Sequence, residues 1–238
     1  MNASAAYEEW HARLGVDAEA NAPWHLLVRE HLDRSRDIRN KRVLEIGCGR
    51  GGFSCWLATQ ANGDARIVAA DFSPTAVAKG AEYAEGKGIR GIEWEVGDIQ
   101  HIGHASGSFD TVISCETIEH VPDPALAVRE LGRVLVPGGR LFLSTPNYLG
   151  MTGVYRGYLR LIGRRFQEEG QPINNFNMLP RTMAWVRAAG LEVVAATGSG
   201  HYLPFPGRRP LRFRALDALP ALTRWTALHS LVVARKAR

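Results

Sequence analysis

The sequence predicts an α/β fold in which helices cover both faces of a mostly parallel β-sheet. The first observation is that short apolar runs, typical of buried strands, alternate along the chain with longer helical patterns. The second is that glycines stop helical patterns just before strand-like runs, at Gly138-Gly139 and at Gly190. Such alternation is typical of parallel strands joined by crossover helices. The strand-like runs are 43–46, 66–70, 92–96, 110–114, 140–145, 191–197 and 230–234.

Helical patterns fill most of the intervals between these runs. Residues 5–39 have a helical pattern, and the later ones lie near 51–61, 74–86, 123–134 and 180–189. Two stretches, 146–179 and 198–229, do not follow the alternation and are rich in Pro, Gly, Arg and aromatic residues. Irregular segments between late strands commonly shape substrate pockets, so we expect these two to cap one.

Length and composition predict a single domain over residues 1–238. A content of 45% hydrophobic residues is ample for one core. No apolar run approaches the ~20 residues that a bilayer span needs, and the acidic residues within 1–20 are unlike a signal peptide. The three cysteines, Cys48, Cys55 and Cys115, are scattered and odd in number, which favours reduced thiols in a cytosolic protein over disulfides or a zinc site.

Charge is divided unequally between the two parts of the chain. Residues 1–149 carry 15 Lys/Arg and 20 Asp/Glu, a net charge of −5, whereas residues 150–238 carry 14 and 4, a net charge of +10. The C-terminal part is therefore expected either to meet an acidic or phosphate-rich partner or to be a solvated basic face.

The segment "VLEIGCGRGGF" (43–53) fits two nucleotide-binding patterns. Residues 47–52 satisfy G-x-G-x-x-G, the dinucleotide fingerprint, and the same stretch started at Glu45 satisfies acidic-x-G-x-G-x-G. Glu45 ends the first strand, where the ligand of an open α/β sheet binds. A carboxylate there repels a pyrophosphate by a few kcal/mol. It attracts instead the ammonium and sulfonium groups of S-adenosylmethionine.

Two more carboxylates follow strands at the same edge of the predicted sheet. Asp71 ends the second strand, where a carboxylate accepts hydrogen bonds from ribose hydroxyls. Asp98 follows the third strand and is placed to accept from an adenine amino group, with Ile99 covering the ring. Three carboxylates around one pocket suit a cationic ligand, whereas Arg50 within the loop does not fit that pattern.

The motifs "VLEIGCGRGGFS", "AADFSP", "VGDI", "FDTVISCETIEHVPDP" and "LVPGGRLFLSTPN" follow one another over about residues 40–147. In this order they resemble the motifs of class I S-adenosylmethionine-dependent methyltransferases, and most of all the ubiquinone-biosynthesis O-methyltransferases and related small-molecule enzymes. The resemblance implies a Rossmann-like, seven-stranded sheet whose last strand is antiparallel. It also implies S-adenosylmethionine as cofactor. The cofactor-binding residues expected from charge and from the resemblance together are Glu45, Gly47, Gly49, Gly51, Asp71, Phe72, Asp98, Ile99 and Cys115.

Within the single domain, four parts are expected from the pattern and the resemblance. Residues 1–40 form an N-terminal helical lid and residues 41–147 the cofactor-binding core. Residues 148–229 combine strands with substrate-capping insertions, and residues 230–238 hold the last strand and a tail.

Glu116, Glu119 and His120 directly follow the fourth strand and are the candidate catalytic residues. If the segment is helical, positions i, i+3 and i+4 lie on one face. The quinone O-methyltransferases that the chain resembles bind a divalent metal at the equivalent E-x-x-E-H, and two carboxylates with one imidazole suit magnesium, manganese or zinc. Three roles stay open for this segment: a metal site, His120 as a metal-free general base, or a lining of the pocket.

The acceptor site is expected in the basic half. The candidate substrate-contacting residues are Asn174, Asn175, His201 and Tyr202. The segment 155–166 predicts a basic amphipathic helix, at the position of a membrane-associating insertion in the enzymes resembled. Tyr155, Tyr158, Leu159, Ile162 and Phe166 share one side of it, and Arg156, Arg160 and Arg164 share another. The helix is therefore either a peripheral membrane contact or an ordinary lid.

The sequence as a whole predicts transfer of a methyl group from S-adenosylmethionine to a hydroxyl of a small-molecule or lipid-like acceptor. N-methylation of a small-molecule or sugar amine is the alternative within the class. An NAD-dependent oxidoreductase and a non-catalytic binding subunit are alternatives outside it. No nucleic-acid substrate is expected, because the turn "SCETIEH" after the fourth strand lacks the N-P-P-Y-like sequence used for base amines, and no RNA-binding stacking motif is present.

Overall fold

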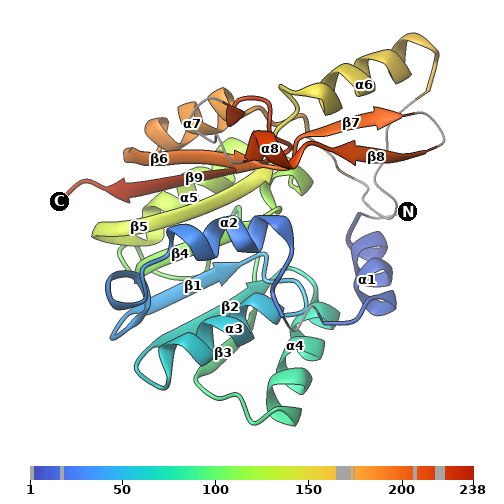
Figure 1. Ribbon diagram of the computed structural model, residues 1–238. Coiled ribbons are helices and arrows are strands. Elements are labelled where there is room, and N and C mark those ends of the chain that lie inside the picture. Colours follow the sequence, from blue (N-terminus) through green and yellow to red (C-terminus); the bar gives the residue numbers. More distant parts are fainter. Residues whose placement is uncertain (1–2, 17–18, 165–172, 174, 206–207, 218–222) are drawn as a thin grey trace.

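The structure is a computed structural model that describes residues 3–16, 19–164, 173, 175–205, 208–217 and 223–238 (Figure 1). One seven-stranded sheet runs through it in the order β3-β2-β1-β4-β5-β9-β6. Its strands are β1 (Arg42–Ile46), β2 (Arg66–Asp71), β3 (Ile92–Val96), β4 (Phe109–Cys115), β5 (Leu135–Pro146), β6 (Leu191–Ser199) and β9 (His229–Lys236). Strands β1 to β5 are parallel, and β9 pairs antiparallel with both β5 and β6. The predicted sheet, with seven strands and an antiparallel last strand, is confirmed.

Helices cover both faces of this sheet because alternate side chains of each strand point to opposite sides (Figure 1). Leu44 of β1 belongs to an apolar core with Leu131 of α5 (Pro124–Val134) and Val186 of α7 (Leu179–Ala188). Val43 belongs to the core on the other face, which includes residues of α2 (Pro23–His31) and Leu57 of α3 (Gly52–Ala61). The remaining crossover helix, α4 (Pro74–Gly86), packs against β2 and β3. The four later helices lie where the sequence predicts them.

The N-terminal segment differs from the prediction of one helical stretch over 5–39. It contains α1 (Ala3–Arg13), α2 and a short π-helical turn, η1 (Arg34–Ile38). Pro23 is the first residue of α2, where its missing N–H and fixed φ are tolerated, and it cannot continue a helix from before. The break therefore follows from proline chemistry that the apolar pattern does not show.

Helix α6 (Met151–Leu161) begins and ends four to five residues earlier than the predicted helix over 155–166, and one of its arginines is buried. It ends before Gly163, whose φ of +73° is left-handed. Arg156 is buried, and its guanidinium lies 3.5 Å from the ring centroid of Phe176 and 4.4 Å from that of Tyr148. Four apolar residues are exposed along with Arg160: Met151, Val154, Tyr158 and Leu161. The predicted grouping of Arg156 with Arg160 and Arg164 on one exposed face is wrong, because aromatic rings take up the Arg156 side chain; Phe166 lies outside the described residues.

The segment after β6 is more regular than predicted. Strands β7 (Tyr202–Phe205) and β8 (Arg208–Arg212) form an antiparallel hairpin, and α8 (Arg214–Asp217) follows (Figure 1). The hairpin packs against α6. The insertion after β5, which contains α6, therefore lies against the insertion after β6, which contains the hairpin.

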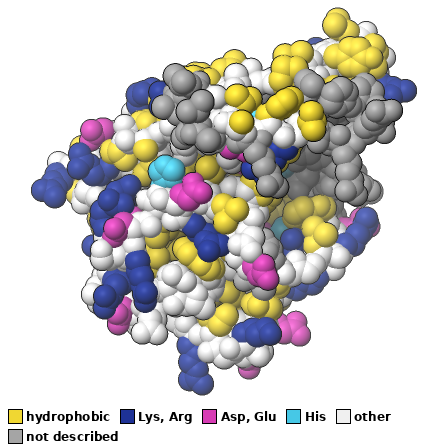
Figure 2. Space-filling model, in the orientation of Figure 1, with side chains coloured by type: hydrophobic (Ala, Val, Ile, Leu, Met, Phe, Trp, Pro, Cys, Tyr) yellow, Lys and Arg dark blue, Asp and Glu magenta, His cyan; other side chains and the backbone are white. Residues whose placement is uncertain are grey.

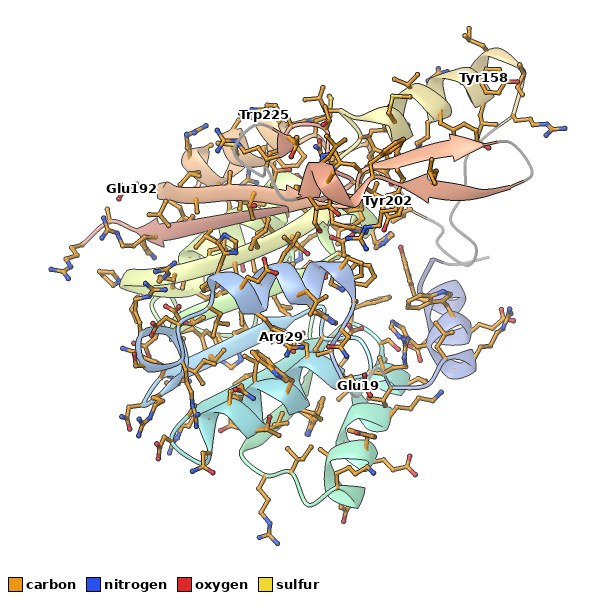
Figure 3. All side chains as sticks on the ribbon, viewed as in Figure 1. Glu19, Arg29, Tyr158, Glu192, Tyr202 and Trp225 are labelled. Carbon is orange, nitrogen blue, oxygen red and sulfur yellow. The ribbon has the colours of Figure 1, made fainter. Side chains whose placement is uncertain are left out.

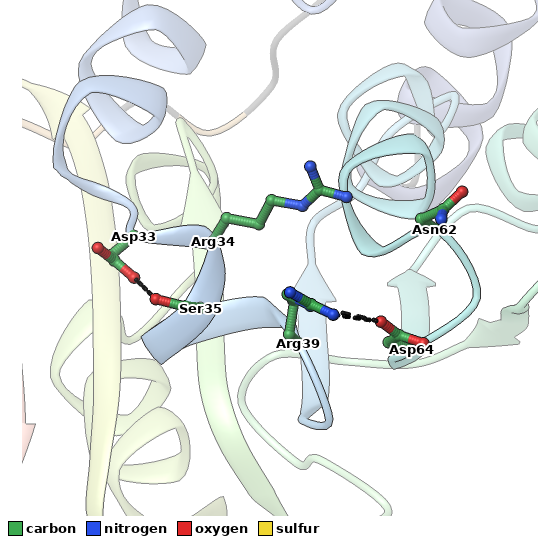
Figure 4. A pocket seen from close by; sticks show the side chains of 6 residues that line it. All are labelled: Asp33, Arg34, Ser35, Arg39, Asn62 and Asp64. Atoms are coloured by element: carbon green, nitrogen blue, oxygen red, sulfur yellow. Dashed lines mark hydrogen bonds and ion pairs between the residues drawn. The ribbon is translucent and has the colours of Figure 1, made fainter.

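A shallow pocket lies at the amino-terminal edge of the sheet, around the residues that precede β1 and β2 (Figure 4). Arg39 and Asp64 form an ion pair of 3.2 Å there, and Ser35 donates to Asp33 at 2.7 Å. Ligands of open α/β sheets bind at the carboxyl ends of the strands, on the opposite edge. The polar side chains of this pocket therefore bind one another, through an ion pair and a hydrogen bond, and the pocket is not the candidate functional site.

Leu131→Ala tests the core beneath α5. Leu131 is completely buried, so its truncation is expected to lower the free energy of unfolding by about 2–5 kcal/mol in a denaturant titration. Leu161→Ala is the matched control, because Leu161 is 88% exposed and its loss should change stability by no more than about 0.5 kcal/mol. Equal effects of the two substitutions would contradict the packing described.

Candidate cofactor and acceptor site

A cavity of about 820 Å³ lies at the carboxyl ends of the parallel strands. Predicted cofactor residues gather on one side of it: Glu45, Gly47, Gly49, Asp71, Phe72, Asp98, Ile99 and Cys115. The candidate catalytic residues Glu116, Glu119 and His120 line it as well. A single cavity therefore joins the two sets of residues that the sequence analysis selected separately.

The loop from β1 into α3 has the left-handed backbone that its glycines allow. Gly47 has φ +77°, and a side chain there would collide with Thr117. Gly51 has φ +73°, caps the start of α3 and leaves room for the Trp94 ring. Gly51 does not line the cavity, so its role is in packing the loop.

Asp71 is held in place by backbone hydrogen bonds. The N–H of Gly49 donates to one carboxylate oxygen at 2.8 Å and the N–H of Ser73 donates to the other at 2.9 Å. Burial raises the pKa of Asp71, and the Ser73 hydrogen bond opposes that shift. A carboxylate fixed by two donors at the end of β2 is preorganised to accept from a ligand's hydroxyls.

Glu45 points from β1 toward α3 and is only 2% exposed. The hydroxyl of Ser54 in α3 donates to its carboxylate. Burial raises the pKa of Glu45 to about 8; the Ser54 hydrogen bond opposes the rise and the charge of Asp71 adds to it. The carboxyl group lies in the cavity wall, where the sequence analysis predicted it.

The adenine-side prediction rests on Asp98 and Ile99, and both line the cavity. Ile99 is 4% exposed, which suits an apolar cover for a flat ring. Asp98 accepts a hydrogen bond from the N–H of Gln100 at 2.8 Å, and its side chain is 46% exposed.

The positive charge of Arg50 did not fit the expectation of a cationic ligand, and its side chain is directed at α1. Its Nε donates to the carbonyl oxygen of Gly15 at 2.5 Å, and its guanidinium lies 5.3 Å from the Trp10 ring. Lys79 of α4 donates to the carbonyl oxygens of His11, Ala12 and Leu14 at the end of the same helix. These contacts fasten α1 beside the cavity.

Three side chains of α1 line the cavity, namely Tyr7, Trp10 and His11. Nε2 of His11 lies 4.0 Å from Asp71. The Tyr7 hydroxyl donates to the carbonyl oxygen of His120 at 3.3 Å, so α1 reaches from the cofactor side to the acceptor side. Sequence reasoning missed these residues, since no motif marks them.

The three predicted catalytic side chains do not share one helical face. The only helical turn here is η2 (Ile118–His120), and Glu116 precedes it with a left-handed φ of +48°. Glu116 accepts from the Ser144 hydroxyl at 3.1 Å, while Glu119 accepts from the Thr145 hydroxyl at 3.2 Å. Nδ1 of His120 lies 2.9 Å from the carbonyl oxygen of Ile173, and its Nε2 lies 3.8 Å from Glu119.

This arrangement does not fit a metal site, one of the three roles that the sequence left open for this segment. The two carboxylates accept hydrogen bonds from different hydroxyls of β5, and within the described residues no three His, Cys, Asp or Glu side chains are placed to hold a metal ion. The prediction assumed a regular helix from 116 to 120, and the left-handed residue at 116 breaks that helix.

The predicted substrate-contacting residues have other partners. Asn175 donates from its backbone N–H to the carbonyl oxygen of Glu119 at 2.8 Å and from its side chain to the carbonyl oxygen of Val121 at 2.7 Å. These two hydrogen bonds hold the turn after β4. His201 is buried between Asp217 and the carbonyl oxygen of Thr223, at 2.8 and 3.1 Å. Tyr202 lies on β7 (Figure 3), and the Arg212 guanidinium lies 5.9 Å from the centroid of its ring. None of these three lines the cavity, contrary to the prediction, and Asn174 lies outside the described residues.

Aromatic and imidazole side chains line the cavity instead, with Trp24, His25, Tyr148 and His229 among them. His229 is the first residue of β9, and its Nδ1 lies 3.7 Å from Glu116. Because β9 is antiparallel, its first residue and not its last lies at the carboxyl edge of the sheet, paired with Pro146. The antiparallel direction expected for the last strand could have identified His229, because it places the start of that strand at the cavity.

Comparison with known proteins agrees with this geometry. Residues 44–143 match the family described as "Methyltransferase domain". A ubiquinone biosynthesis O-methyltransferase of Xanthomonas euvesicatoria pv. vesicatoria is 32% identical over 200 residues, covering 81% of this chain and 80% of that protein. The chain belongs to the class I S-adenosylmethionine-dependent methyltransferases.

The fold of this methyltransferase is also found in solved structures. An S-adenosylmethionine-dependent methyltransferase from Mesorhizobium loti has a TM-score of 0.64 and 19% identity, over 91% of this chain and 99% of that one. Another from Aquifex aeolicus has a TM-score of 0.63 and 14% identity, over 96% and 97%.

The glycine loop fits both a dinucleotide-binding and an S-adenosylmethionine-binding pattern, and family membership favours S-adenosylmethionine. The residues present fit that group, because buried carboxyl groups face the cavity at Glu45 and Asp71 and suit a ligand with ammonium and sulfonium charges. The oxidoreductase and the non-catalytic alternatives are set aside on the same ground.

Asp71→Asn is expected to weaken S-adenosylmethionine binding by about ten- to a hundredfold. The single oxygen of the Asn amide cannot replace both carboxylate oxygens that accept from Gly49 and Ser73. The side chain that is expected to bind the ribose therefore loses its charge and its fixed orientation, which should lower the binding free energy by about 1.5–3 kcal/mol. Titration calorimetry measures the effect, with Asp64→Asn in the surface ion pair as the control. Unchanged affinity in Asp71→Asn would exclude Asp71 from the cofactor site.

Proposed function

We propose that this methyltransferase acts on a hydroxyl of an amphipathic small molecule, with His120 as the general base. The observation that carries the proposal is the orientation of the His120 ring. A carbonyl oxygen can only accept, so the contact between Nδ1 and Ile173 puts the proton on Nδ1 and leaves Nε2 as the basic nitrogen. His120 lines the same cavity as the cofactor residues.

The cofactor, when bound, supplies a methyl group on a good leaving group. The residues of the chain then have two tasks, which are to align the acceptor and to take up its proton. Nε2 of His120 is placed for the proton, and Glu119, 3.8 Å from that nitrogen, lies beside the imidazolium that forms. Tyr7 and Trp10 of α1 border the cavity, so we propose that α1 acts as the N-terminal lid and limits water.

The aromatic wall of the acceptor side supports a flat, largely apolar acceptor. Trp24, Tyr148 and His229 offer ring surfaces there, and the rings of Trp24 and His229 lie 5.4 Å apart. The Xanthomonas relative is named for ubiquinone biosynthesis and O-methylation, which favours oxygen as the methylated atom. N-methylation is the alternative, and it needs no base when the amine arrives neutral.

His120→Ala is expected to reduce the turnover of a hydroxylated aromatic acceptor by about 10²–10⁴-fold while leaving the affinity for S-adenosylmethionine unchanged. His104→Ala is the matched control, since His104 pairs with Glu95 and does not line the cavity. Because the described carboxylates do not converge on a metal, activity should also persist in excess chelator.

Two results would contradict this proposal in different ways. Full activity of His120→Ala would exclude the general base and favour a neutral amine as acceptor. Loss of wild-type activity in chelator, restored by magnesium, manganese or zinc, would return Glu116, Glu119 and His120 to a metal site.

We further propose that α6 contacts an anionic membrane surface, from which an amphipathic acceptor enters. The exposed apolar residues Met151, Val154, Tyr158 and Leu161 recur at helical spacing, and Arg160 and Arg164 are exposed beside them. Figure 2 shows hydrophobic side chains gathered over α6, at the end of the molecule remote from β3. None of the helices in the described part of the chain has the length and apolarity of a membrane span, so the contact proposed is peripheral.

Binding to anionic vesicles is expected at low salt and should weaken as the Debye length falls from ~10 Å at 0.1 M to ~3 Å at 1 M. The double variant Arg160→Glu/Arg164→Glu should lose vesicle binding and keep its affinity for S-adenosylmethionine. Arg90→Glu/Arg187→Glu carries the same charge change at exposed sites away from α6 and should still bind. A wild type that ignores anionic vesicles at low salt would make α6 a plain lid.

A further inference from the structure

Glu45 is a buried carboxyl group with little to stabilise its charge. Its side chain lies between β1 and α3 at 2% exposure, and the Ser54 hydroxyl is its hydrogen-bond donor. Among the residues that the structure describes, no Lys, Arg or His forms an ion pair with Glu45. Asp71 differs, because two backbone N–H groups donate to its carboxylate.

The titratable groups around Glu45 add no positive charge. Asp71, on the next strand, contributes a negative one. Cys48 and Cys115 are buried, and burial raises the pKa of both thiols. Burial likewise raises the pKa of Cys55 to about 11, so all three thiols are neutral. Burial lowers the pKa of His11, which keeps that imidazole neutral beside Asp71.

An ionised carboxylate in such surroundings costs several kcal/mol of lost hydration, and a buried acid escapes this cost by keeping its proton. The pKa of about 8 agrees with that argument and leaves about nine-tenths of Glu45 protonated at pH 7. The cofactor site therefore contains a neutral carboxylic acid where the sequence pattern suggests a permanent negative charge.

We propose that cofactor binding is coupled to proton release from Glu45. The carboxyl is neutral in the free enzyme and ionises as the ammonium group of the cofactor enters the cavity beside it. In the overall step, the acid and the ligand's ammonium give a carboxylate–ammonium pair, and the proton passes to the solvent. The ligand thus supplies the positive charge that the protein itself does not place there.

This coupling has a consequence for selectivity. A ligand with an ammonium group offsets the cost of ionising Glu45, whereas a neutral nucleoside leaves the acid protonated. The demethylated product keeps its ammonium group, so it is expected to release a proton as the cofactor does. The inference concerns the cofactor alone and does not depend on the acceptor or on His120.

Calorimetric titration in two buffers of different ionisation enthalpy counts the protons released. For the wild type at pH 7 we expect about 0.8 proton released per S-adenosylmethionine, which is the ~0.9 from Glu45 less the ~0.1 that a free α-amino group takes up. The apparent affinity should fall about eightfold from pH 7 to pH 6. With 5′-methylthioadenosine, which has no ammonium group, the count should be near zero.

Glu45→Gln is the matched variant, because an amide has the shape of the protonated acid and cannot ionise. In this variant, binding of S-adenosylmethionine should take up about 0.1 proton instead of releasing about 0.8. Its affinity for S-adenosylmethionine should not fall between pH 7 and pH 6. Ser54→Ala is a second variant that keeps Glu45 but removes the hydrogen bond that favours its charge, so its net proton release at pH 7 should rise from about 0.8 toward about 0.9.

A wild type that binds S-adenosylmethionine without releasing a proton would overturn the inference while leaving the methyltransferase assignment intact. The same release in Glu45→Gln would also overturn it, since another group would then be the source. If Glu45→Gln does not fold, the wild-type count and the response of Ser54→Ala still decide the matter.

Discussion

The left-handed turn between β1 and α3 is the constraint on which the rest of the site depends. Gly47, Gly49 and Gly51 all have positive φ, so α3 begins within a few residues of the end of β1. The early start of α3 places Ser54 opposite Glu45 and brings the N–H of Gly49 to Asp71. Thr117 and Trp94 fill the space that side chains at Gly47 and Gly51 would need. A single turn therefore fixes two carboxyl groups and the floor of the cavity.

Charge is used differently on the two sides of the cavity. On the cofactor side, Asp71 is stabilised by backbone donors, whereas Glu45 is held neutral by burial. On the acceptor side, carboxylates of Glu116 and Glu119 lie beside imidazoles, with His229 at 3.7 Å and His120 at 3.8 Å. The first side suits a cation that arrives with the ligand, and the second suits a proton that leaves the acceptor.

The sequence predicted most of what depends on local pattern. Strands β1 to β6 and β9 were visible as apolar runs, and Glu45 and Asp71 were identified because strand ends meet at one edge of a parallel sheet. What it missed depends on tertiary contacts. The burial of Arg156 follows from the aromatic rings that enclose its side chain, and the position of His229 follows from the antiparallel β9. Asn175 was expected to face a ligand and instead holds the backbone of the turn that carries His120.

We infer that the cofactor site selects its ligand through the ligand's positive charge, which lies beside Glu45, and through ribose hydroxyls, which donate to Asp71. A crystal structure of the enzyme with the demethylated cofactor tests this most directly. We expect the ligand's ammonium nitrogen within about 4 Å of the Glu45 carboxylate and both ribose hydroxyls at Asp71. An ammonium group bound elsewhere, with Glu45 still bonded only to Ser54, would contradict it.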